Sequence, residues 1–291
     1  MTPEEILAYE SRVRTRQVAI AALAGVCLIV ASVIQLTGTH TKVDELTSDL
    51  LVANQRFPLD LIASVINAVA SLAIASTLLF LLRAARSRNP ERVRSWIRYI
   101  ALVGGVLAAV AGVVYAIVVA IKVHEFATTG SQTYAEANHL TSGSGLLGLQ
   151  VLGQLAALLV AVAFVLVSLQ AMNQGLLSRF MGYLGMFAGA LVLFQITQVP
   201  VVQTFWLLAV AYLISGRWPT GVPPAWRSGR SEPWPSSAEM RARRAAEMGE
   251  RRPRGAKQPA TVPAVEPEAA ATPANARTRA STPKRKRKRR N

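Results

Sequence analysis

Residues 99–121 read YIALVGGVLAAVAGVVYAIVVAI, a run of 23 residues without one charged side chain. The run is apolar all round rather than on one helical face, and a segment of this kind must be buried or lie in lipid. As an α-helix it would reach about 35 Å, which is enough to cross the roughly 30 Å hydrocarbon core of a bilayer. This stretch therefore predicts a transmembrane helix.

Five more apolar blocks have the same character, and we place them at residues 18–36, 59–82, 145–169, 180–198 and 201–216. The last block reaches only about 24 Å as a helix, whereas one kinked helix across the final two blocks would be about 54 Å long, too long for one crossing. A tight helical hairpin turning at Pro200 fits better. The sequence thus predicts an all-α, polytopic transmembrane helical bundle of six helices over residues 17–216.

Two short motifs predict where the second and third helices begin. Pro58 suits the first helical position, where a missing N–H costs nothing, and Asp60 favours the positive start of a helix. Asn89, Pro90 and Glu91 supply a cap, a first-turn proline and a first-turn acid. These three residues predict a short basic helix that continues into the third span.

The cationic residues alternate between the connections. Residues 217–291 hold 19 of the 32 Lys and Arg residues, and ten more lie in the leader 1–16, in the connection 83–98 and at Arg179. The remaining connections hold only Lys42, Arg56 and Lys122. Because cytoplasmic loops carry the excess of Lys and Arg, we predict a multi-pass plasma-membrane protein whose leader, amino terminus and carboxyl terminus are cytoplasmic.

Residues 217–291 differ from the rest of the chain in composition. They hold 11 of the 15 prolines and show no apolar periodicity, so we predict a disordered, basic cytoplasmic tail. The tail ends in seven adjacent cations, which we expect either to be solvated without a dedicated partner or to be attracted to the anionic lipid headgroups of the nearby leaflet. These cations are Lys284, Arg285, Lys286, Arg287, Lys288, Arg289 and Arg290. No aromatic side chain is interleaved with them, so nucleic acid is the less favoured partner.

Four segments between residues 176 and 235 are distinctive. They read LLSRFMGYLG at 176–185, FWLLA at 205–209, GRWPTGVPPAW at 216–226 and EPWP at 232–235. This part of the chain resembles a group of uncharacterised actinobacterial-type multi-pass membrane proteins, which share the exit from the last helix through Gly-Arg-Trp-Pro and Pro-Pro-Ala-Trp. The resemblance implies a multi-pass topology and carries no activity and no functional residue.

Side-chain amides in the predicted spans gather toward the outer side. The predicted outer polar cluster consists of Asn67, Gln150, Gln154, Gln195 and Gln198. One interpretation is that these amides hydrogen-bond across helices and hold the bundle together. The other is that they line a polar cavity that faces outward. No charged residue or histidine lies in the middle of a span, which argues against a proton relay or a voltage sensor.

The three histidines, His40, His124 and His139, all fall on the predicted outer side. Glu136 precedes His139 by three residues, so the two would share one helical face. Imidazole and carboxylate are suitable zinc ligands, which makes these four residues candidate metal ligands. Since loop histidines are most often simply solvated, we predict no metal site and no cofactor.

Small residues recur every four positions in two predicted helices, at Gly104, Ala108 and Gly112 and again at Gly185 and Gly189. Such faces let helix backbones approach closely, and we predict that these residues make intramolecular helix contacts.

No catalytic motif supports an enzyme. The chain lacks the Gly-x-Ser-x-Gly, His-Glu-x-x-His and phosphate-loop patterns, and its single cysteine, Cys27, lies in the first apolar block. We predict a non-enzymatic helical bundle that binds a small ligand from the outer side. The alternatives are a small-solute transporter or channel subunit, and a membrane tether whose polybasic tail binds anionic lipid or nucleic acid.

Overall fold

The structure is a computed structural model that describes most of the chain. The described residues are 2–37, 46–194, 200–218, 221–232, 234, 238–239, 241–242 and 245–246. By its internal contacts the chain divides into two units, Met1–Ser236 and Ser237–Asn291. In the second unit the few described residues are helical.

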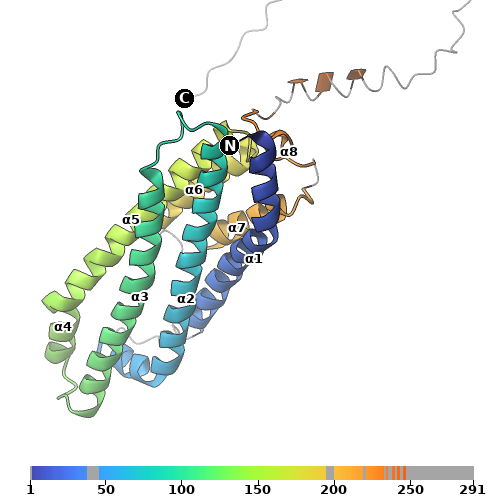
Figure 1. Ribbon diagram of the computed structural model, residues 1–291. Helices are drawn as coiled ribbons and strands as arrows, with labels where there is room; N and C mark the ends of the chain where they lie inside the picture. The colour runs from blue at the N-terminus through green and yellow to red at the C-terminus, as the bar shows by residue number, and fades with distance from the viewer. Residues whose placement is uncertain are drawn as a thin grey trace, which may run out of the picture. The chain divides into compact units, whose positions relative to one another are not determined.

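The described part of the chain is helical and contains no strand. The helices are α1 (Pro3–Leu36), α2 (Leu46–Arg88), α3 (Ile97–Thr128), α4 (Tyr134–Ser142), α5 (Ser144–Asn173), α6 (Arg179–Phe194), α7 (Val201–Ile214) and α8 (Pro224–Ser228) (Figure 1).

Six of the helices form a ring. Each contacts the next in the order α1, α2, α3, α5, α6, α7, and α7 closes the ring against α1. α2 also contacts α5 across the ring, while the short α4 contacts α2, α3 and α5 at one end. The core of the bundle contains fully buried residues of α7 such as Trp206, Leu207 and Val210. α7 therefore serves as a central packing element although it is one of the shorter apolar helices.

Four helices, α1, α2, α3 and α5, are long and apolar enough to cross a membrane. Their outward faces carry exposed large apolar side chains, including Val26, Leu72, Leu102 and Val151. Exposed apolar surface of this extent is characteristic of a protein solvated by lipid. The all-α membrane architecture is thereby confirmed. α6 and α7 have 16 and 14 residues, and the predicted count of six crossings stays a prediction.

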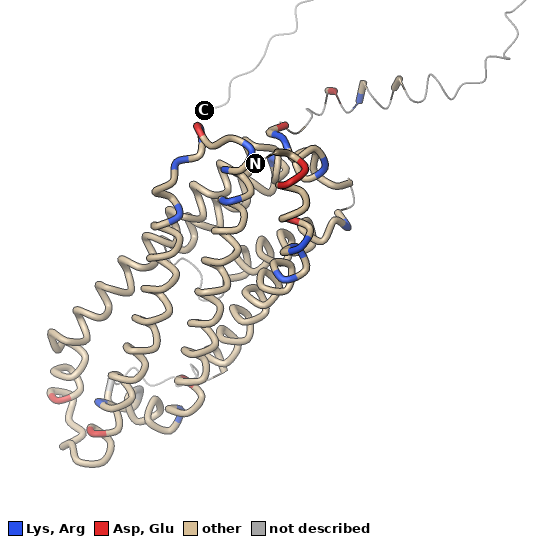
Figure 2. The backbone as a smooth tube through the Cα atoms, viewed as in Figure 1, with Lys and Arg blue, Asp and Glu red and all other residues tan. Residues whose placement is uncertain are grey.

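Charged residues lie at the two ends of the helices, and the middle is uncharged (Figure 2). One end, here called the arginine-rich end, contains the start of α1, the connection from α2 to α3 and the start of α6. The opposite end contains α4 and the start of α2. The uneven distribution of Lys and Arg along the sequence predicts this arrangement.

In the structure α1 and α2 begin before the predicted apolar spans. α1 begins at Pro3 rather than at residue 18, because Thr2 and Glu5 form a capping box. The predicted leader is thus the first part of a long helix. α2 begins at Leu46, which places Pro58 inside the helix, and Asp60 pairs with Arg56 one turn earlier at 3.4 Å.

The predicted basic helix before the third span is also absent. Residues 90–96 form turns, Asn89 accepts a hydrogen bond from the backbone N–H of Arg92 at 3.2 Å, and α3 starts only at Ile97. The boundary of the predicted tail at residue 217 differs from the structure as well. α8 lies within that segment, and Ala225 in α8 is fully buried. The folded unit therefore includes α8, which lies beyond the predicted boundary.

The predicted small-residue contacts are intramolecular. A side chain added at Gly104 would meet Leu159 of α5 at 2.9 Å, and one added at Gly189 would meet Ala161 and Phe164 of α5 at 2.8 and 2.9 Å. Gly185 likewise faces Ser168 and Trp206. Gly112 has no such neighbour within 4 Å. These glycines allow α3 and α6 to lie close against α5.

Candidate ligand-binding cavity

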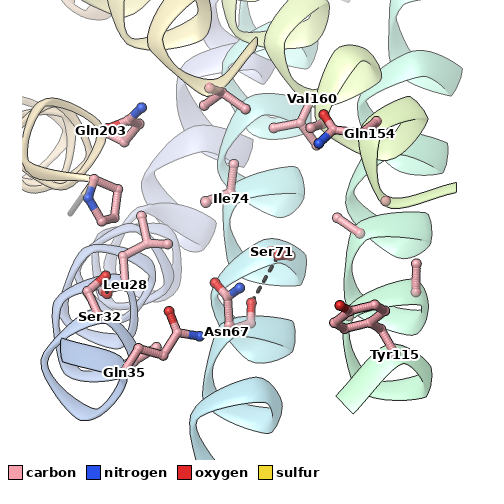
Figure 3. A pocket seen from close by; sticks show the side chains of 18 of the residues that line it. Leu28, Ser32, Gln35, Asn67, Ser71, Ile74, Tyr115, Gln154, Val160 and Gln203 are labelled. Carbon is pink, nitrogen blue, oxygen red and sulfur yellow. Dashed lines mark hydrogen bonds between the residues drawn. The ribbon is translucent and has the colours of Figure 1, made fainter. Parts of the chain in front are cut away.

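A cavity of about 700 Å³ lies inside the ring of helices (Figure 3). Every helix of the ring contributes to its wall, from Leu28–Gln35 in α1 through Val192 in α6 to Gln203 in α7. Gln35 lies near the end of α1 and Pro200 at the start of α7, so the cavity lies toward the end opposite the arginines. A volume of this size is within the range of small-molecule sites in proteins.

Toward the arginine-rich end the cavity stops at Ile74 and Phe164. The Trp206 ring packs edge-on against Phe164 with the ring centroids 5.2 Å apart, and its indole N–H donates to the Met181 carbonyl at 2.9 Å. Leu78 and Val167 continue the packed core and are 1% and 0% exposed. The lining residues of the cavity therefore do not extend into the half of the bundle that carries the arginines.

Three members of the predicted outer polar cluster lie on the wall of this one cavity. Asn67 comes from α2, and Gln150 and Gln154 come from α5. The Ser71 hydroxyl donates to the backbone carbonyl of Asn67, one turn earlier in α2, at 2.9 Å (Figure 3). Gln195 and Gln198 lie outside the described residues. The wall carries no Asp, Glu, Lys, Arg or His among the described residues, so its polar groups are all neutral.

Gln203 is the most deeply placed amide of the cavity. Only 5% of the residue is exposed, and its Nε2 donates to the Ala188 carbonyl of α6 at 3.2 Å. Its Oε1 is buried and has no hydrogen-bond partner among the described residues. A buried acceptor of this kind costs free energy unless a donor reaches it. Gln203 thus places a buried, unsatisfied acceptor beside the cavity wall.

Sequence reasoning missed two lining residues, Ser32 and Tyr115. Ser32 precedes Gln35 by three residues, so the two share a face of α1, and this spacing is a signal that was available. Tyr115 lies within the charge-free stretch 99–121, where nothing distinguishes a cavity-facing side chain from a lipid-facing one. Tyr115 carries the only phenol among the lining residues in the described part of the chain.

A second cavity, of about 360 Å³, adjoins the first and shares Gln35, Asn67 and Tyr115 with it. Its wall includes Asp60, which pairs with Arg56. The Ser64 hydroxyl, also on this wall, donates to the Gly112 carbonyl at 3.0 Å and ties α2 to α3. The two cavities together extend the polar space from the ring toward the opposite end.

The candidate metal ligands do not come together. Within the described residues, no group of three or more His, Cys, Asp and Glu side chains is placed to hold a metal ion. Glu136 accepts hydrogen bonds from Ser131 and Gln132 at the start of α4, and His124 contacts Asn54 at 3.3 Å. His139 lies exposed in the last turn of α4, and His40 lies outside the described residues.

The polybasic run at residues 284–290 also lies outside the described residues. Its predicted attraction to anionic lipid stays a prediction.

A scan against models of protein families finds no match for the chain, and neither do searches of curated proteins and of solved structures.

Proposed function

We propose that this chain is a non-enzymatic six-helix bundle of the plasma membrane, with both termini cytoplasmic, which binds a small uncharged ligand from the outer side. The observation that carries the proposal is the cavity inside the ring, to which all six helices contribute wall residues and five of them contribute neutral polar side chains. Convergence of a few hydrogen-bonding side chains in an otherwise apolar cavity is typical of small-molecule sites. The placement of the Lys and Arg residues supports the orientation.

The wall also indicates the chemistry of the ligand. Leu28, Ile74 and Phe164 supply apolar surface, and the amides of Asn67 and Gln203 supply hydrogen-bonding groups. Amide oxygens on the wall, such as that of the exposed Asn67, accept hydrogen bonds from N–H or O–H groups of a ligand. A charged ligand would have no counter-ion among the described lining residues, and burying an unpaired charge is costly. We therefore expect a neutral molecule with an apolar part and at least one N–H or O–H group.

The closed inner end favours binding over conduction. A transporter or channel subunit would need polar lining to continue past Phe164, where the structure has the buried aromatic contact with Trp206. Membership of the actinobacterial-type family is part of the proposal and rests on the motifs of residues 176–235. Two of these motifs supply buried packing residues, Trp206 of α7 and Ala225 of α8.

Cysteine labelling tests the orientation and the access to the cavity. In a chain whose only cysteine, Cys27, is replaced by alanine, we expect Gln154→Cys in whole cells to react with a membrane-impermeant maleimide added outside. Gln154 is exposed and lines the cavity, whereas Thr77 of α2 is 1% exposed within the packed core. Thr77→Cys is the matched control and should stay unlabelled. Labelling of Gln154→Cys only after the cells are opened would contradict the proposed orientation.

Filling the cavity tests the ligand proposal directly. A panel of small neutral amides, alcohols and phenols is screened for compounds that raise the melting temperature of the purified full chain in detergent. Gly153 lines the cavity, and a Cβ built there has no neighbour within 4 Å, so Gly153→Phe should fold and occupy the cavity. We expect the shift caused by a hit to disappear in Gly153→Phe. It should persist in Gly148→Phe, an equally open position of α5 outside the cavity wall. Equal shifts in both variants would place the compound elsewhere.

A further inference from the structure

A groove runs along the outer surface of α1, α2 and α3 at the arginine-rich end. Two adjoining cavities form it, of about 270 and 240 Å³, and they share Tyr9, Phe80 and Arg83. The larger one continues from these residues along α2 as far as Leu72 and reaches Val106 of α3. From Arg83 to Leu72 the helical rise is about 16 Å, so the groove extends well into the apolar part of the bundle.

The wall of the groove is mostly apolar and faces outward. Leu72 and Leu102 are each 47% exposed, and Val106 is 42% exposed. Leu79 and Phe80 form the base between them. In a chain that spans a bilayer, this surface faces lipid tails, because it lies on the outside of the ring and away from the cavity inside it. The groove is therefore suited to an elongated apolar group.

Arg83 gives one end of the larger cavity, where it meets the smaller one, a positive charge. Its guanidinium donates to the Tyr9 hydroxyl at 3.1 Å, and the side chain is exposed. Among the described residues no carboxylate forms an ion pair with Arg83, and the carboxylate of Glu10, which lines the smaller cavity, pairs with Arg88. Five fixed N–H donors make guanidinium well suited to a phosphate group. A phosphate at Arg83 would lie at the end of the larger, mostly apolar cavity.

We propose that this groove binds an anionic phospholipid of the cytoplasmic leaflet, with its phosphate on Arg83 and one acyl chain along α2. The proposal rests on the membrane orientation proposed above and does not depend on the cavity ligand. Charge decides between occupants: a second copy of this chain would bring another arginine-rich end to the same place, whereas an anionic headgroup neutralises Arg83. Basic pockets between transmembrane helices on the cytoplasmic side bind anionic headgroups in this way.

Native mass spectrometry of the purified full chain tests this proposal. The protein is equilibrated with phosphatidylglycerol or with phosphatidylcholine of the same acyl chains, and the bound lipid is counted as the lipid concentration rises. We expect phosphatidylglycerol to bind at least about tenfold more tightly, and Arg83→Gln to remove most of that preference. Arg98→Gln is the matched control, because Arg98 is exposed at the same end but lies outside the groove.

A second variant distinguishes lipid binding in the groove from a general attraction of anionic lipid to the basic tail. The tail is present in every variant compared. Ser76 lines the groove, so Ser76→Phe should fill it and lower phosphatidylglycerol binding about tenfold while every arginine remains. Equal loss in Arg83→Gln and Arg98→Gln, or no preference between the two lipids, would overturn the proposal. The cavity ligand is tested separately by its melting-temperature shift, so the two proposals can fail independently.

Discussion

Replacing Glu10 with alanine is expected to lower the free energy of unfolding by about 3–5 kcal/mol, because it leaves a buried guanidinium charge without its partner. Arg88 donates to the two carboxylate oxygens of Glu10 at 2.5 and 2.8 Å, and the side chains of Arg88 and Glu10 are 0% and 8% exposed. Unfolding of the purified chain in detergent micelles with increasing dodecyl sulfate would measure the loss.

The same arginine holds α8 against the helices. Arg88 donates to the Ala225 carbonyl at 3.2 and 3.0 Å, and the Trp226 ring lies 5.2 Å from its guanidinium carbon. Trp226 in turn stacks on Phe80 and donates to the Leu176 carbonyl at 3.1 Å. Glu10→Ala should therefore also expose α8 to proteases, because the side chain that anchors α8 loses the carboxylate that fixes it.

Two further variants show whether the buried charge is the cause. Glu91→Ala removes an exposed carboxylate at the same end and should change the free energy of unfolding by less than about 0.5 kcal/mol. The double variant Glu10→Leu with Arg88→Met replaces the pair with apolar groups and should recover most of the lost stability. A double variant as unstable as Glu10→Ala would mean that the hydrogen bonds to Ala225, and not the unpaired charge, dominate.

The sequence predicted the membrane helices because their signal is local. A charge-free block of about 20 residues needs no knowledge of its neighbours, and the blocks at 99–121 and 145–169 lie within α3 and α5. The sequence signals for helix starts depend more on the surrounding chain. Pro58 was assigned to a first turn by its type alone, but the helix already begins at Leu46, and one proline inside a long helix is tolerated when neighbouring helices support it.

The ends of the fold depend on contacts between distant residues. Glu10 and Arg88 are 78 positions apart, and Arg14 caps the end of α7 by donating to the Ile214 carbonyl. Neither contact leaves a periodic pattern in the sequence. Composition predicted a disordered tail from residue 217 onward. In the structure Ala225 is buried, and Arg88 donates a hydrogen bond to its carbonyl. Single well-placed contacts of this kind are invisible to averages over a segment.

The candidate site was partly accessible from sequence. Amides within apolar spans are rare, so Asn67, Gln150 and Gln154 could be singled out, and they line one cavity. Which neutral side chains join them depends on the rotation of each helix, which sequence does not specify. Gln203 is not part of the predicted outer polar cluster, but α7 turns it inward against Ala188. The burial of the Gln203 amide oxygen follows from that packing.

Replacing Trp206 with alanine is the second change with a large expected effect, about 3–5 kcal/mol of lost stability. Trp206 is 0% exposed, packs on Phe164 and donates to the Met181 carbonyl. Its loss would leave an internal space just beneath the cavity floor. The same unfolding measurement in detergent and dodecyl sulfate reports the change.

Trp206→Phe distinguishes the contribution of the aromatic ring to stability from that of the indole hydrogen bond. Phenylalanine keeps an aromatic group against Phe164 but cannot donate to Met181, so a smaller loss of about 1–2 kcal/mol is expected. Ser168 is buried and lies on the far side of the contact between Trp206 and Phe164. If the Trp206 ring closes the cavity floor, a cysteine at position 168 should be labelled from outside in Trp206→Ala. It should stay unlabelled in Trp206→Phe. Equal labelling in all three backgrounds would show that Trp206 stabilises the bundle without sealing it, and the inner boundary of the cavity would then have to lie at other residues.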